Sequence, residues 1–102
     1  MQIIFKPRFV TELNGTLTYI SEHSLYAREK FLDDLMILIS KKIPPQPFLY
    51  PEFSKMRTTA KVFRRALFKK KWNVVYKVEP DRLLFISIFH SSRNIAKMKF
   101  DY

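Results

Sequence analysis

Hydrophobic positions divide the chain into an N-terminal part with helical spacing and a C-terminal part with strand alternation. The apolar run from Gln2 to Lys6 stops at Pro7, which predicts a first or edge strand. The next apolar residues repeat at the spacing of one helix face, at Phe9, Leu13, Leu17 and Ile20. This pattern predicts a helix that directly follows the strand.

A second helix is predicted from Leu25 to about Ile43. Its polar residues lie mostly opposite one apolar face, which carries Ala27, Phe31, Leu35, Leu38 and Ile39. Residues 21–24 interrupt the helical pattern, and Ser24 can cap the second helix. Two helices with so short a break predict an antiparallel helical hairpin.

The second half predicts a long connection and then three strands. Prolines prevent the helix from continuing beyond Ile43, so residues 44–61 are expected to form a connection. Its aromatic residues Phe48, Tyr50 and Phe53 are expected to cover the edge of the core. VFRRALF, KWNVVYKV and RLLFISIFH then read as strands joined by tight turns at Lys-Lys and Glu-Pro-Asp, which predicts an antiparallel meander. The tail, residues 95–102, is short and basic.

These elements predict a single α+β domain over residues 1–102. An N-terminal strand and an antiparallel helical hairpin precede a three-stranded antiparallel meander, and the helices are expected to pack on one face of the sheet.

Alternation along the strands predicts which side chains share a face. One face is expected to lie under the helices, with Ala66, Phe68, Trp72, Val74, Tyr76, Leu83, Phe85 and Phe89. The other is expected to be open, with Phe63, Arg65, Leu67, Asn73, Val75, Lys77, Ile86, Ile88 and His90. In this register Arg65 and His90 stand roughly 16 Å apart, as the two banks of a groove.

The net charge of the chain indicates the kind of molecule that it binds. Nineteen Lys and Arg against nine Asp and Glu give a formal net charge of +10, which favours a polyanionic or acidic partner. The chain contains no cysteine, no recognisable signal peptide and no apolar run as long as a membrane span, so a cytoplasmic location is expected. Two isolated histidines do not predict a metal site, and no cofactor is expected.

The order of elements and the C-terminal residues together resemble the RelE/ParE superfamily, the toxins of type II toxin–antitoxin modules, also described as plasmid stabilisation systems. The resemblance covers essentially the whole chain. Its most specific part is FRRALFKKKWNVVYKVEPDRLLFISIFHSSRN, in which Arg65, the segment from Trp72 to Tyr76, and the His90–Arg93 pair occupy the places of the family pattern.

The resemblance implies a twisted antiparallel sheet backed by two helices and neutralised by a cognate antitoxin protein. RelE-like members are endoribonucleases (mRNA interferases) that cut ribosome-bound messenger, whereas ParE-like members inhibit DNA gyrase without being enzymes. Messenger cleavage is the preferred hypothesis for the function of this protein, and gyrase inhibition is the alternative hypothesis. A degenerate toxin or a basic nucleic-acid-binding module is the weaker alternative.

RNA cleavage would require a titrating group and cations around the phosphate. His90 is the expected base, kept neutral by nearby cations, with Arg65 and Arg93 on the phosphate. The residues expected to bind nucleic acid or a partner are Lys69, Lys70, Lys71, Asn73 and Lys77. Asn73 stands where many RNA-cleaving members carry an arginine, and the lost charge corresponds to about 2–4 kcal/mol of transition-state stabilisation.

Overall fold

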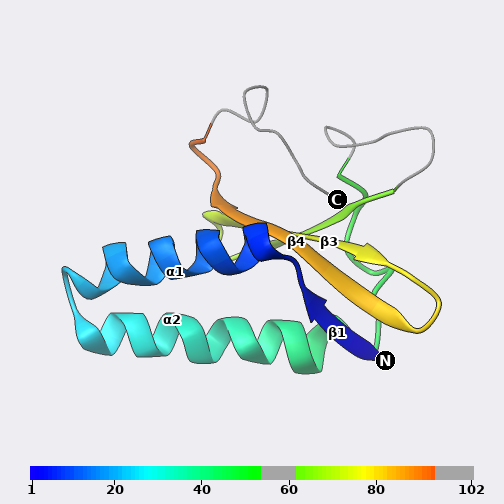
Figure 1. The fold of residues 1–102 in the computed structure, drawn as a ribbon, viewed down its shortest axis with the longest axis horizontal. Coiled ribbons are helices and arrows are strands. Elements are labelled where there is room, and N and C mark those ends of the chain that lie inside the picture. The colour runs from blue at the N-terminus through cyan, green and yellow to red at the C-terminus, as the bar shows by residue number, and fades with distance from the viewer. Residues whose placement is uncertain (54–61, 94–102) are drawn as a thin grey trace.

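A computed structural model describes residues 1–53 and 62–93 of the chain. Strand β1 (Gln2–Phe5) leads into helix α1 (Pro7–Ser21), and helix α2 (Leu25–Ile37) follows. The C-terminal half supplies β2 (Arg64–Phe68), β3 (Trp72–Val78) and β4 (Arg82–His90). The α+β class and the two helices are confirmed, and Figure 1 shows the helices running antiparallel beside the sheet. The predicted tail and part of the predicted connection lie outside the described residues.

The helix boundaries follow the local chemistry of the chain. Pro7 occupies the first turn of α1, where its missing N–H needs no partner. The Ser24 hydroxyl accepts a 3.1 Å hydrogen bond from the backbone N–H of Ala27, which confirms the predicted cap of α2. Beyond Ile37 the helix continues as one π-helical turn, Leu38–Lys42, so helical structure extends almost to the predicted end.

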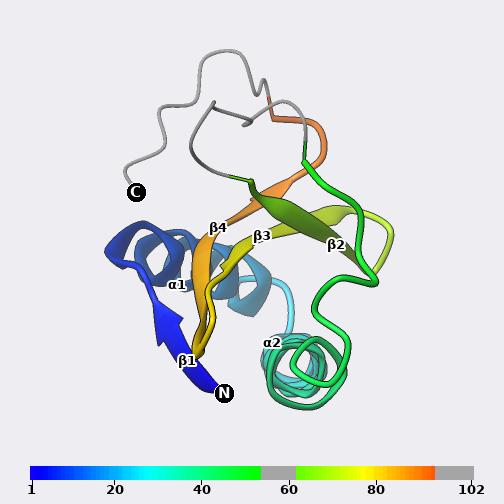
Figure 2. The same cartoon turned by 90° about the vertical axis from the view of Figure 1, so that its right-hand side faces the viewer.

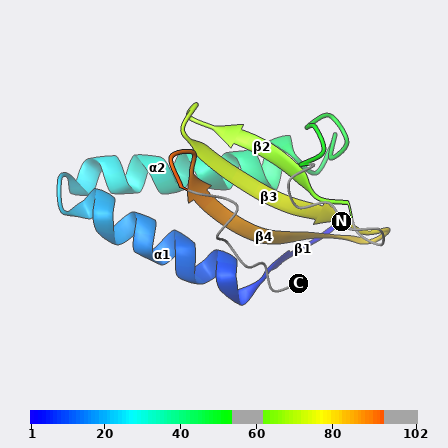
Figure 3. The same cartoon turned by 90° about the horizontal axis from the view of Figure 1, so that it is seen from above.

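The sheet has four strands in the order β1-β4-β3-β2 and is mixed (Figure 3). The predicted antiparallel pairings of β2 with β3 and of β3 with β4 are confirmed. The N-terminal strand joins this meander as a fourth strand and pairs parallel with β4, with Ile3 opposite Leu83. The α1–α2 hairpin between β1 and the meander gives the chain the length that such a parallel pairing requires.

Both faces of the sheet are covered by apolar packing. The helices pack against the first face of the sheet (Figure 2). The large buried side chains of this core include Phe9 and Leu35 from the helices and Tyr76 and Phe85 from the sheet. The second face carries a smaller cluster of five buried residues, Phe53, Phe63, Val75, Ile86 and Phe89. The expectation that this second face is open is therefore wrong for Phe63, Val75 and Ile86.

The expected packing of the connection aromatics is confirmed for two of the three. Phe53 is buried on the second face, and Tyr50 packs against Tyr76 with ring centroids 6.4 Å apart. Phe48 is exposed, and the guanidinium of Arg64 lies over its ring at 4.9 Å.

A β-bulge in β4 changes the face of every residue after it. Val75 pairs with Ser87 and Tyr76 pairs with Phe85, so Ile86 is an extra residue between them. Beyond the bulge, Ile88 lies among the residues under the helices, whereas Phe89 lies on the second face. The predicted faces of Ile88 and Phe89 were therefore wrong.

Candidate functional site

The bulge brings His90 to the helix side of the sheet, where the end of β4 meets the start of β3. His90 is the register partner of Trp72, and the two rings meet edge to face with centroids 5.1 Å apart. The Trp72 ring also packs edge to face against Phe31 of α2, with ring centroids 5.4 Å apart. This ring stack fixes the position of the imidazole at one end of the molecule.

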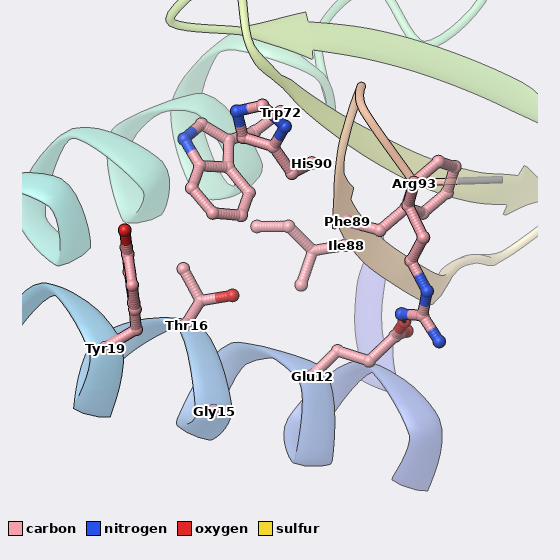
Figure 4. Close-up of a pocket in the computed structure, with 9 residues that line it drawn as sticks. All are labelled: Glu12, Gly15, Thr16, Tyr19, Trp72, Ile88, Phe89, His90 and Arg93. Carbon is pink, nitrogen blue, oxygen red and sulfur yellow. Dashed lines mark hydrogen bonds and ion pairs between the residues drawn. The ribbon is translucent and has the colours of Figure 1, made fainter.

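A groove separates this ring pair from helix α1. We call it the α1–β4 groove. One part of the groove has a volume of about 290 Å³ (Figure 4). This part is lined by Glu12, Gly15, Thr16, Tyr19, Trp72, Ile88, Phe89, His90 and Arg93. A neighbouring part of about 530 Å³ shares Tyr19, Trp72 and His90 and adds Ile20, Lys71 and Ser92. The two parts adjoin, since they share these three aromatic side chains, and we treat them together as the groove.

Gly15 leaves the α1 wall of the groove bare. A Cβ atom built on this residue would meet no atom within 4 Å. Gly15 is the only glycine of the chain, and a glycine inside a helix costs about 1 kcal/mol relative to alanine. One turn further along the helix, the Tyr19 ring lines the groove (Figure 4), is 61% exposed, and meets the His23 ring edge to face at 5.3 Å.

Hydrogen bonds from Ser92 orient the imidazole of His90. The backbone N–H of Ser92 donates to Nδ1 at 3.0 Å, and the Ser92 hydroxyl lies 2.8 Å from the same nitrogen. A nitrogen that accepts from an N–H carries no proton, so the neutral ring is protonated at Nε2. Nε2 therefore presents an N–H in the neutral and in the charged ring, and this geometry favours a hydrogen-bond donor over the expected base.

Arg93 is tied to helix α1 through Glu12. Its Nη1 donates to Oε2 of Glu12 at 2.9 Å. The other carboxylate oxygen accepts from the buried Ser87 hydroxyl at 2.6 Å and from Nε of Arg8 at 3.2 Å. Glu12 is thus surrounded by two arginines, which balance its charge and place the half-exposed Arg93 beside the groove.

Arg65 lies on the other face of the sheet, and the predicted grouping of Arg65 with His90 is wrong. Its Nη1 donates to Oδ1 of Asn73 at 3.1 Å, and its guanidinium lies over the Phe53 ring at 5.5 Å. The amide of Asn73 is buried and donates to the Phe89 carbonyl at 3.3 Å. The physical reason is the bulge at Ile86, which reverses the side of His90 but leaves β2 and β3 unchanged.

The predicted lysines are distributed around the molecule. Lys69 pairs with Asp34 of α2 at 2.7 Å, and Lys77 pairs with Glu79 at 2.7 Å. Lys70 and Lys71 are exposed at the β2–β3 turn and form no ion pair with the residues that the structure describes. Only Lys71 of these four lines the α1–β4 groove.

Ion pairing lowers the pKa of two partly buried carboxylates outside the groove. Hydrogen bonds from Lys69 and then from Lys30 hold the pKa of Asp34 below its usual value. Hydrogen bonds from Lys77 and Arg82 do the same for the pKa of Glu79. Burial raises the pKa of Tyr76, whose hydroxyl donates to the Pro47 carbonyl at 2.6 Å.

From α1 the structure adds four groove residues that the sequence did not single out as site residues, namely Glu12, Gly15, Thr16 and Tyr19. They recur at intervals of three and four, which is the spacing of one helix face. This stripe could have been recognised, but nothing local says that it faces the end of β4, 75 residues away at Ser87.

Across residues 1–53 and 62–93, no cluster of three or more His, Cys, Asp or Glu side chains is suited to hold a metal ion. No helix in these ranges is both long enough and apolar enough to cross a membrane. Comparison with known proteins finds no family model that matches the sequence and no similar curated protein.

Proposed function

We propose that the protein is the toxin of a type II toxin–antitoxin module of the RelE/ParE kind and that it inhibits translation by cutting ribosome-bound messenger RNA. The supporting observation is the α1–β4 groove, where His90 lies beside aromatic rings and between two cations, Lys71 and Arg93. The cognate partner would be an acidic antitoxin, which suits a chain of net charge +10.

The chemistry assigned to the groove is cleavage through the 2′-hydroxyl of the RNA. Arg93 and Lys71 stabilise the charge that develops on the phosphate. The 2′-oxygen attacks the phosphorus as its proton passes to a water molecule, the bond to the 5′-oxygen breaks, and a 2′,3′-cyclic phosphate is left. Nε2–H of the neutral His90 donates a hydrogen bond to the departing 5′-oxygen, which takes its proton from water, while Nδ1 continues to accept from the Ser92 N–H. The ribosome supplies the alignment of the messenger. Arg65 has no part in this step, because it lies on the opposite face.

The test is translation of a defined messenger in a cell-free extract, with mapping of the new 5′ ends. The wild-type protein should give discrete cuts, and His90→Ala and Arg93→Ala should each reduce cutting by at least about tenfold. Arg82→Ala is the matched control, because it removes an exposed arginine at the other end of β4.

Gyrase inhibition is the second candidate, and the separation of Arg65 from His90 favours it. The cutting site predicted between Arg65 and His90 is not assembled, whereas an exposed basic surface is sufficient to bind another protein. Intact messenger together with blocked DNA supercoiling by purified gyrase would overturn the cleavage proposal in favour of this one. Intact messenger and normal supercoiling, with harmless expression, would refute both.

A further inference from the structure

We propose that the α1–β4 groove binds one unpaired base of single-stranded RNA between Tyr19 and Trp72, with the adjoining phosphates on Lys71 and Arg93. This inference rests on the proposed function for the choice of RNA as ligand. It adds a base-binding subsite on the helix side of the sheet.

The shape of the groove suits a flat ring. Tyr19 of α1 and Trp72 of β3 both line the groove (Figure 4), and its lining also includes the apolar side chain of Ile88. The bare backbone at Gly15 keeps the neighbouring helix wall open. Aromatic walls of this kind bind unpaired bases by stacking, with little dependence on sequence.

The charges around the groove suit the backbone of the same nucleotide. Lys71 is exposed at one end without an ion pair to the described residues, and Arg93 is half exposed at the other. Among the described residues, Glu12 is the only carboxylate that lines the groove, and Arg8 and Arg93 already balance it, so it does not repel a phosphate as a free carboxylate would. Nε2 of His90 adds a neutral or cationic donor between the two ends.

Tryptophan fluorescence tests the proposal directly, because Trp72 is the only tryptophan of the chain. Purified full-length protein is titrated with an RNA hexamer of adenosine, and with tripolyphosphate at matched ionic strength. We expect the hexamer to change the Trp72 emission and tripolyphosphate to leave it unchanged. The same change with both ligands would show that charge alone is bound and would overturn the proposal.

Two pairs of variants locate the base. Gly15→Leu fills the groove and should weaken hexamer binding at least tenfold, whereas Gly15→Ala should bind as wild type. Tyr19→Ala removes a stacking ring and should cost about tenfold in affinity. Tyr26→Ala removes an even more exposed tyrosine from α2, outside this groove, and should cost nothing. Equal affinity in Tyr19→Ala and Tyr26→Ala would overturn the proposal even if Gly15→Leu does not fold.

The outcome is separable from that of the proposed function. Hexamer binding with this variant pattern, in a protein that cuts no messenger, supports the base subsite and refutes the cleavage proposal. Messenger cleavage without any change in Trp72 emission refutes the base subsite and leaves the cleavage proposal standing.

Discussion

Glu12 and Arg93 are 81 residues apart in the sequence and are joined by a 2.9 Å hydrogen bond between Oε2 and Nη1. The same carboxylate accepts from the fully buried Ser87 hydroxyl. This contact links helix α1 to the residues that follow β4, so one side chain connects the stability of the fold with the shape of the groove.

Glu12→Ala should lower the free energy of unfolding by about 1–3 kcal/mol, because it leaves the buried Ser87 hydroxyl without its acceptor. Urea denaturation measures the loss, and Glu29→Ala, an exposed carboxylate of α2, is the matched control. In the double variant with Ser87→Ala the two losses should not add, since the second change removes the unpaired hydroxyl. Strict additivity would contradict the assigned contact.

Asn73→Arg should not create or increase RNA cleavage, although an arginine is common at this place in the RNA-cleaving RelE-like proteins that the sequence resembles. The position faces Arg65 on the side of the sheet away from His90. The substitution also breaks the buried hydrogen bonds of the Asn73 amide, which should cost about 1–3 kcal/mol in urea denaturation.

Leu67→Arg is the control for this substitution, because Leu67 is the register partner of Asn73 and is 53% exposed. It should change stability little. A gain in messenger cleavage by Asn73→Arg would show that the cutting site lies on the second face after all.

Lys70→Gly should stabilise the protein by about 1 kcal/mol. Lys69 and Lys70 are the central residues of the turn between β2 and β3, with φ angles of 50° and 64°, a left-handed conformation that glycine adopts without steric cost. Thermal unfolding would then rise by about 4–8 °C for a domain of this size. Lys71→Gly is the control, because Lys71 lacks a positive φ and should gain nothing. A lower melting temperature for Lys70→Gly would contradict this reading.

Asp34 should make the stability of the protein depend on acid pH. Because hydrogen bonds from Lys69 and Lys30 lower its pKa below the ordinary 3.8, the folded state binds this proton more weakly than the unfolded state. The contribution is complete above the ordinary pKa and is lost as the pH falls through the lowered pKa of the folded state.

The difference in urea midpoint between wild type and Asp34→Asn should therefore be constant at neutral pH, shrink below about pH 4, and diminish in high salt. A difference that grows toward acid pH would refute the assignment.

Candidate site residues were predictable only where their positions follow from local pattern. His90 and Arg93 were singled out as candidate site residues because they lie at the end of the last apolar strand and just beyond it. Lys71 was singled out because it belongs to a basic turn. The error in pairing His90 with Arg65 has a clear origin. Residues 83–86, 88 and 89 are all apolar, so the sequence carries no polar marker that would reveal an extra residue at Ile86.

The sequence by itself determined the elements: the cap at Ser24, the stop at Pro7, the helical stripes and the three C-terminal strands, since these depend on neighbours within a few residues. The tertiary structure decided the parallel β1–β4 pairing, the bulge and the meeting of Glu12 with Arg93. Those features depend on contacts between distant segments, and on a side-chain parity that a single inserted residue reverses.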